Sequence, residues 1–143
     1  MEVISSMGGR RLENAELESI LEESRIARIC CLNEDGTIHA TPVWYKYMNG
    51  KVVFLTPDHS RKGRNIKRNK NVTVLIDVVK PARGVMIYGK AELDYGDILP
   101  TAITICEKYM EKEKARSFAE MLAEKVMDLI VSINPERMIT FHF

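Results

Sequence analysis

A cluster of hydroxyl and cationic side chains, Thr56 followed by Ser60, Arg61 and Lys62, is the part of this sequence best suited to chemistry. Thr56 ends an apolar, β-branched run and Ser60 is a residue type that begins helices, so the segment predicts a strand, a short loop and a helix. The free N–H groups and the positive dipole end of such a helix attract anions. Arg61 and Lys62 add a guanidinium fork and a point charge, which suit a terminal phosphate monoester. A solvated basic helix is the alternative interpretation of the same residues.

The charge of the chain is concentrated around this cluster. The 143 residues include 21 Lys or Arg and 20 Asp or Glu, which gives a formal net charge of +1. Residues 60–70 contain six of the cations and no acid, so this segment carries +6 and the rest of the chain −5. The distribution indicates one anion site rather than a uniformly basic surface. Because the segment also lacks an aromatic side chain on which bases could stack, we expect no nucleic-acid partner.

A second candidate segment is Thr41-Pro42-Val43-Trp44-Tyr45. Pro42 cannot donate to a strand ladder, so it predicts an edge or a bulge with backbone groups available to a ligand. Trp44 could stack on a planar ring, or it could simply be a core residue. His59 could bind a phosphate or a haem iron. No residue pattern identifies a protein acid, base or nucleophile, so the catalytic residues stay unassigned and a cofactor would carry any reaction.

The elements that must position these residues are mostly strands. Strands are predicted over 26–32, 37–47, 51–56, 72–79, 85–93, 129–133 and 137–143, and helices over 14–24, 60–68, 97–116 and 117–125. The run 127–133 could instead extend the preceding helix, although its β-branched content favours a strand. Turns are expected at 80–84 and at Asn134-Pro135, and the interior Gly89 predicts either a bulge or the close approach of another group. About seven hairpin-connected strands, with a meander over 26–56 and peripheral helices, predict a mainly-β α+β fold, a small antiparallel barrel in one domain over 1–143.

The cysteines and the apolar runs indicate the cellular compartment in which the protein is expected. Cys30 and Cys31 are adjacent, so on a strand their side chains point to opposite faces, and Cys106 lies far away in sequence. Three thiols without metal-type spacing predict a reducing compartment and no metal site. No apolar run approaches the roughly 18–20 residues of a membrane span, and the first residues do not resemble a signal peptide. We therefore expect a cytoplasmic protein that does not act at a membrane.

The segment from Val52 to Asp77, VVFLTPDHSRKGRNIKRNKNVTVLID, resembles the signature of the FMN-binding split β-barrel proteins related to pyridoxamine 5′-phosphate oxidase. The preceding HATPVWYKYMNG is similar to the flavin-facing hairpin of that family, and the likeness extends from Ile26 to Phe143. The resemblance implies a split barrel that binds FMN at the subunit interface of a homodimer. It also implies the site residues: Ser60, Arg61 and Lys62 on the phosphate with Thr56 nearby, Pro42, Val43 and Trp44 along the isoalloxazine, and, as a loose match, Lys46 near the ring.

Two departures from the family concern the substrate. Gly84 stands where the true oxidase has a glutamine that reaches the flavin from the second subunit. The oxidase's arginine-rich substrate segment would follow the strand Ile139–His142, and this sequence stops at Phe143. The resemblance therefore implies an FMN-dependent oxidoreductase, such as a flavin reductase, that acts on a small molecule other than pyridoxine phosphate. The alternatives are a reductase that uses the deazaflavin coenzyme F-420, and a flavin- or haem-binding protein without catalysis.

Overall fold

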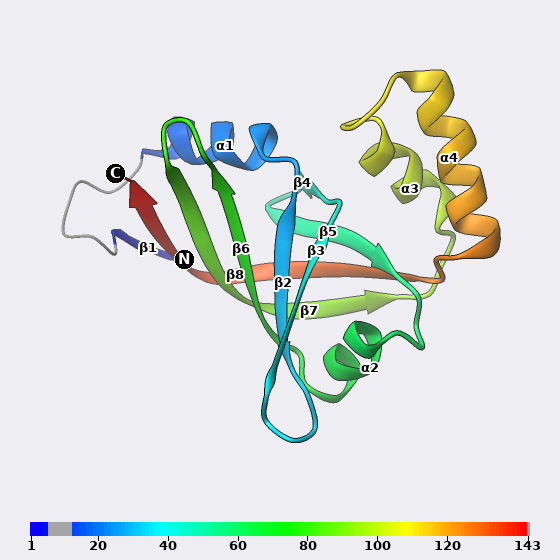
Figure 1. Ribbon diagram of the computed structural model, residues 1–143, viewed down its shortest axis with the longest axis horizontal. Helices are drawn as coiled ribbons and strands as arrows, with labels where there is room; N and C mark the ends of the chain where they lie inside the picture. Colours follow the sequence, from blue (N-terminus) through cyan, green and yellow to red (C-terminus); the bar gives the residue numbers. More distant parts are fainter. Residues whose placement is uncertain (6–12, 143) are drawn as a thin grey trace.

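The computed structural model describes residues 1–5 and 13–142, which form one curled sheet with helices packed around it (Figure 1). The strands are β1 (Glu2–Ser5), β2 (Ala27–Leu32), β3 (Ile38–Val43), β4 (Lys46–Met48), β5 (Lys51–Thr56), β6 (Asn71–Val78), β7 (Arg83–Asp94) and β8 (Leu129–His142). The helices are α1 (Asn14–Glu23), α2 (Arg61–Arg68), α3 (Leu99–Cys106) and α4 (Lys112–Lys125).

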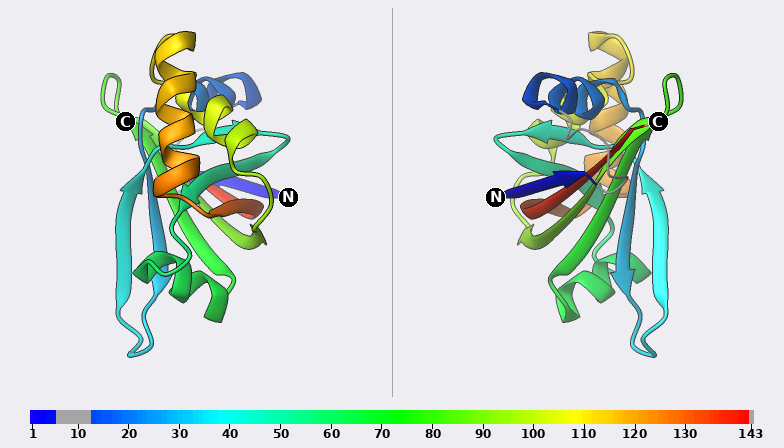
Figure 2. Two further views of the ribbon diagram at one scale, coloured as in Figure 1. Left: turned by 90° about the vertical axis from the view of Figure 1, so that its right-hand side faces the viewer. Right: turned by 90° about the vertical axis from the view of Figure 1, so that its left-hand side faces the viewer.

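The order of the strands explains why the sheet curls. Along the sheet the order is β3-β2-β6-β7-β8-β5-β4, and all of these neighbours are antiparallel. The two ends of this order, β3 and β4, are separated in the chain only by Trp44 and Tyr45, so the sheet must bend until its ends meet (Figure 2). The predicted mainly-β split barrel is therefore confirmed. β1, which was not predicted, pairs in parallel with β8.

Apolar residues form two separate cores. The larger core fills the inside of the curled sheet, where Phe54 of β5 and Ile20 of α1 are fully buried. The smaller core lies between the sheet and the two helices α3 and α4, where Val53 and Ile130 meet Ala119. Because β5 contributes to both cores, it is buried on both faces. The α3–α4 pair and α2 lie on either side of the end of β5 (Figure 1), so the second core brings the helices close to the predicted anion site.

The predicted meander over 26–56 is wrong at its centre. The expected strand 37–47 is divided into β3 and β4, which do not pair with each other and lie at opposite ends of the sheet order. β3 is an edge strand, as Pro42 predicts, since proline has no N–H to donate to a further strand. The Asn49-Gly50 turn has positive φ values of 54° and 73°, as a tight hairpin requires.

The predicted turn at Asn134-Pro135 is also wrong, because β8 runs without interruption from Leu129 to His142. Pro135 stands opposite Gly89, and the register shifts there, so the strand accommodates the proline at a β-bulge. A Cβ on Gly89 would lie 2.5 Å from the Asn134 carbonyl oxygen. The bulge that Gly89 predicts is thus confirmed, while Phe143, the end of the predicted last strand, lies outside the described residues.

The predicted helix over 97–116 ends early. α3 stops at Cys106, where the N–H groups of Tyr109 and Met110 both donate to the Cys106 carbonyl and close a tight turn before α4. α4 then continues through the boundary predicted at 116/117. The run from Leu129 is strand, as its β-branched content indicates, and β7 begins at Arg83, within the predicted turn.

No helix within the described residues is both long and apolar enough to cross a membrane.

Candidate functional site

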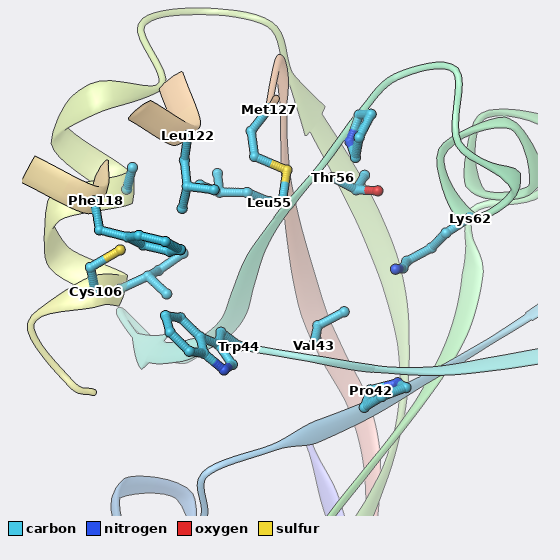
Figure 3. Close-up of a pocket in the computed structure, with 13 residues that line it drawn as sticks. Pro42, Val43, Trp44, Leu55, Thr56, Lys62, Cys106, Phe118, Leu122 and Met127 are labelled. Carbon is cyan, nitrogen blue, oxygen red and sulfur yellow. The ribbon is translucent and has the colours of Figure 1, made fainter. Parts of the chain in front are cut away.

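A pocket of about 350 Å³ lies between the end of β5, the start of α2 and the α3–α4 pair (Figure 3). The bend from β3 to β4 forms its floor. Its lining residues are Pro42, Val43, Trp44, Leu55, Thr56, Pro57, Lys62, Ala102, Ile105, Cys106, Phe118, Leu122 and Met127. Figure 3 shows Lys62 and Thr56 on one side of this pocket and Phe118, Cys106 and Leu122 on the other.

The start of α2 has the features of an anion site. Ser60 caps the helix, as predicted: its hydroxyl accepts from the Gly63 N–H at 3.0 Å and lies 2.8 Å from the Thr56 hydroxyl. One of these two hydroxyls donates its proton to the other. The proton of the second hydroxyl is therefore free to form a hydrogen bond with a ligand. Among the described residues, the backbone N–H groups of Arg61 and Lys62 have no acceptor. Two backbone donors and one hydroxyl are therefore available beside the positive end of the helix dipole.

The later cations of the basic segment have structural partners. Lys67 forms an ion pair with Asp58 at 2.7 Å, which holds the pKa of that carboxyl below its usual range. Arg68 lies 3.6 Å from Glu34, and the Lys70 amine donates to the Lys67 carbonyl at 2.7 Å. These are the cations on which a nucleic-acid interface would depend, and each of them is engaged within the fold.

The earlier cations differ from them. Arg61, Lys62 and Arg64 form no ion pair with any side chain of the described residues. Lys62 is partly buried and its amine points into the pocket, and this burial lowers the pKa of Lys62. Arg61 is exposed. The pKa of Asp35 in the β2–β3 turn is lowered mainly by hydrogen bonds from Thr37, and the Arg61 guanidinium adds a smaller effect. A ligand in the pocket therefore meets Lys62 first.

Trp44 lines the pocket at the point where the two ends of the sheet meet. Its ring stacks on Tyr109, with centroids 4.4 Å apart and planes 12° apart, and it makes a tilted contact with Phe118 at 5.7 Å. Trp44 remains 41% exposed, so it is not a core residue. The Tyr109 hydroxyl accepts from the Tyr45 N–H at 2.9 Å and donates to the Tyr45 carbonyl at 3.2 Å. Tyr109 thus fixes both the ring of Trp44 and the backbone beside it.

Lys108 supports the same bend from its other side. Its amine lies 3.6 Å from the centroid of the Tyr45 ring and donates to the Leu21 carbonyl at 3.3 Å. The Tyr45 hydroxyl donates to the same carbonyl at 2.7 Å. Burial lowers the pKa of Lys108 to about 8 and raises the pKa of Tyr45. These contacts connect the bend to the end of α1.

The structure brings most of the predicted site residues to one pocket: Pro42, Val43, Trp44, Thr56 and Lys62 line it. Ser60 and Arg61 lie in the adjoining first turn of α2 without lining it. Lys46, the loose match, forms an ion pair with Glu22 at 3.3 Å and is not part of the lining. His59 is exposed and does not line the pocket either.

Two residues of α2 position the site and were not predicted. A Cβ on Gly63 would lie 2.6 Å from the Asp58 carbonyl oxygen, so only glycine lets the helix approach the loop that ends β5. Asn65 is buried, and its amide donates to the Asn33 side chain at 2.9 Å and accepts from Arg68 at 2.7 Å. The sequence signal that could have identified Gly63 is a glycine inside a helical run. The role of Asn65 depends on the β2–β3 turn, which is distant in sequence.

The family model described as pyridoxamine 5′-phosphate oxidase matches residues 14–136. The chain belongs to this family. No curated protein matches the chain. The family assignment covers every element from α1 into β8, including both sides of the pocket.

Solved structures share the fold of this family member. A conserved hypothetical protein from Mycobacterium tuberculosis superposes with a TM-score of 0.78 at 22% identity, over 92% of this chain and 85% of that one. A structure named F420 reductase has a TM-score of 0.69 at 19% identity, over 89% and 97% of the two chains. An FAD-binding protein from Mesorhizobium loti has a TM-score of 0.65 at 16% identity, over 90% and 92%. At these identities the likeness establishes the fold alone.

Proposed function

We propose that this member of the pyridoxamine 5′-phosphate oxidase family is an FMN-binding oxidoreductase of the flavin reductase type. The observation that supports the proposal is an anion site at the start of α2 that adjoins an apolar pocket with a partly exposed tryptophan. FMN combines a phosphate monoester with a flat ring, so its two halves match the two parts of the site. When bound, FMN supplies hydride and electron transfer, which the side chains do not provide.

The chain's own residues would bind and orient this cofactor. Lys62, Arg61 and the two free N–H groups of the first turn of α2 would bind the phosphate, together with the proton that Ser60 and Thr56 share. Pro42, Val43 and Trp44 would lie along the ring. The Thr41 hydroxyl, on the same face of β3 as Val43, is buried without a hydrogen-bond partner among the described residues.

We also propose that the protein is a homodimer with FMN at the subunit interface. Three exposed apolar side chains, Leu32, Ile38 and Tyr88, line a shallow groove on the outside of β2, β3 and β7, and such a patch favours association. Multi-angle light scattering is expected to give twice the chain mass, and a monomer at micromolar concentration would contradict this part of the proposal. The three free cysteines suit the reducing cytoplasm, which we propose as the location.

Pyridoxine phosphate is not the substrate that we propose. Gly84 pairs with Phe141 in the sheet, and a Cβ on Gly84 would lie 2.5 Å from the Phe141 ring. The packing therefore has no room for the glutamine side chain that the resemblance places here in the true oxidase.

A deazaflavin is the second candidate cofactor, because a structure named F420 reductase shares the fold over 89% of this chain. Both cofactors carry a phosphate group and a flat ring, so the same pocket could receive either. A non-catalytic haem protein receives less support, since no histidine of the described residues lines the pocket. Parallel titrations with FMN and coenzyme F-420 separate the two candidates, and a tenfold preference for either identifies the cofactor.

The absorption spectrum of the purified protein tests the main proposal. We expect a yellow protein, or a colourless one that binds added FMN with micromolar affinity or better. NADH and NADPH are then compared as reductants of the bound flavin under nitrogen. A protein that takes up neither FMN nor coenzyme F-420 at 100 µM would refute the assignment as a flavoprotein.

A further inference from the structure

Lys108 carries a partly buried amine that the proposed cofactor site does not use. It lies in the turn between α3 and α4 and does not line the pocket. Its Nζ lies 3.6 Å from the centroid of the Tyr45 ring and 5.7 Å from that of Tyr109, and it donates to the Leu21 carbonyl at 3.3 Å. Lys108 forms no ion pair with a side chain of the described residues. The amine is therefore held by two rings and a carbonyl, without a carboxylate partner.

The charges around Lys108 are mostly positive. The Arg25 guanidinium donates to the Lys108 carbonyl at 3.2 Å and lies 5.0 Å from the centroid of the Tyr109 ring. Lys46 of β4 and Glu22 of α1 also lie near Lys108, and these two form an ion pair with each other at 3.3 Å. Arg25, Lys46 and Lys108 thus share a single acid, and Arg25 is exposed. This group, the Arg25 cluster, attracts small anions.

The amine of Lys108 loses its proton more readily than that of an ordinary lysine. Burial is the main reason that the pKa of Lys108 is lowered to about 8. Glu22 raises this pKa again, whereas Lys46 and Arg25 lower it. At pH 7.5 about one quarter of such amines are neutral, against about 0.1% for a lysine with the usual pKa of about 10.4. A neutral amine that donates one N–H to Leu21 keeps its lone pair, so Lys108 has the properties of a nucleophile.

We propose that Lys108 is a modification site that accepts an acyl group from a small acyl phosphate bound at the Arg25 cluster. The lone pair of Nζ attacks the acyl carbon, and an N–C bond forms. The bond from that carbon to the phosphate oxygen breaks, inorganic phosphate leaves with the electron pair, and the amine releases a proton to water. Arg25 and Lys46 attract the anionic donor and its leaving phosphate. The inference goes beyond the proposed function and does not depend on it, because no flavin takes part.

Acylation of Lys108 changes a contact of the bend that lines the cofactor pocket. The product is an uncharged amide, so the attraction between the ammonium and the Tyr45 ring is lost. Tyr45 directly follows Trp44, which lines the pocket. The modification therefore acts next to the ring end of the pocket and away from the anion site of α2.

The acetylation rate of each lysine tests the proposal. Full-length protein is incubated with acetyl phosphate between pH 6.5 and 9.5, and mass spectrometry gives the initial rates. Lys112 and Lys125, exposed at the two ends of α4, are the comparators. At pH 7.5 we expect Lys108 to react at least fivefold faster than either, which is less than the about 200-fold ratio of neutral amine because burial restricts access. The rate at Lys108 should level off above pH 8, whereas the comparators should still accelerate at pH 9.5. Lys62 is recorded separately, because it belongs to the anion site.

A neutral acetyl donor, 4-nitrophenyl acetate, tests the role of the cations. Arg25→Gln removes a cation beside Lys108, and the matched control Arg116→Gln removes an exposed arginine that pairs with Glu120 on α4. The quantity compared is the acetyl phosphate rate at Lys108 divided by the 4-nitrophenyl acetate rate, in which any change in the pKa of Lys108 cancels. We expect Arg25→Gln to lower this ratio at least threefold and Arg116→Gln to change it less than 1.5-fold.

Three results would overturn the proposal. The first is acetylation of Lys108 no faster than that of Lys112 and Lys125. The second is a rate at Lys108 that rises in parallel with theirs up to pH 9.5. The third is the same rate ratio in the Arg25→Gln and Arg116→Gln variants, because the cluster would then not recognise the phosphate of the donor. None of these measurements involves FMN, so the inference and the proposed function fail independently.

Discussion

Replacing Lys62 with glutamine should weaken FMN binding far more than riboflavin binding. Lys62 lines the pocket, is partly buried, and forms no ion pair with the described side chains, so its charge is available to a phosphate. A hydrogen bond to a charged group contributes about 1.5–3 kcal/mol, which corresponds to about a 10- to 150-fold change in affinity. Riboflavin has the same ring without the phosphate, so Lys62→Gln should change its affinity less than threefold.

The control is Lys70→Gln, which removes the same charge from the same segment. Lys70 is exposed and donates to the Lys67 carbonyl, and salt at 0.15 M screens exposed charges beyond about 8 Å. FMN affinity should therefore change less than threefold, and both variants should retain the wild-type melting temperature. Fluorescence titrations of FMN and riboflavin measure the four affinities. Equal losses of FMN affinity in the two variants, or equal losses of FMN and riboflavin in Lys62→Gln, would refute the assignment of Lys62 to the phosphate.

Three further predictions concern the groups that hold the site. Gly63→Ala should destabilise the fold by about 1–3 kcal/mol and weaken FMN binding, because its Cβ would lie 2.6 Å from the Asp58 carbonyl oxygen; an unchanged melting temperature would contradict this. Tyr109→Phe should cost about 1–3 kcal/mol in urea unfolding, because it removes the acceptor of the Tyr45 N–H, while Trp44 keeps its stacking partner. Lys108 has a pKa lowered to about 8, so the unfolded chain binds more protons between pH 8 and the unfolded lysine pKa of about 10.4. The stability of the wild type relative to Lys108→Met should therefore rise over this pH range, and a difference that stays constant between pH 7 and 10 would show that Lys108 is not buried as an ammonium.

Local sequence signals predicted much of the fold. Ser60 as a helix cap, Pro42 on an edge strand and Gly89 at a bulge are all found where local chemistry places them. The division of 37–47 into two strands could not be predicted, since both halves have strand composition and only the closure of the sheet requires the bend. The early end of α3 could not be predicted for a related reason. Tyr109 fits the helical pattern of 97–116 but instead contacts the backbone of Tyr45, 64 residues earlier.

The candidate site likewise combines residues that are adjacent in sequence with residues that are far apart in sequence. The anion site lies within residues 56–62, so its hydroxyls and cations are adjacent in sequence and could be identified together. The apolar part of the pocket combines residues 42–44 and Leu55 with side chains from 102–127. The apolar pattern of residues 102–127 alone is indistinguishable from that of core helices. The role of Gly63 required the position of the β5–α2 loop, which no helical pattern contains.

The two parts of the pocket depend on different supports. Ser60 and Asn65 hold the anion site through contacts within α2 and with the β2–β3 turn. The apolar part of the pocket depends on Tyr109, which joins the α3–α4 pair to the bend that closes the sheet. Because the supports share no residue, a change in one part should leave the other in place. The affinity for the phosphate of FMN and the affinity for its ring are therefore separable properties of this chain. Substitutions in the α3–α4 pair can change which ring is bound without loss of the anion site.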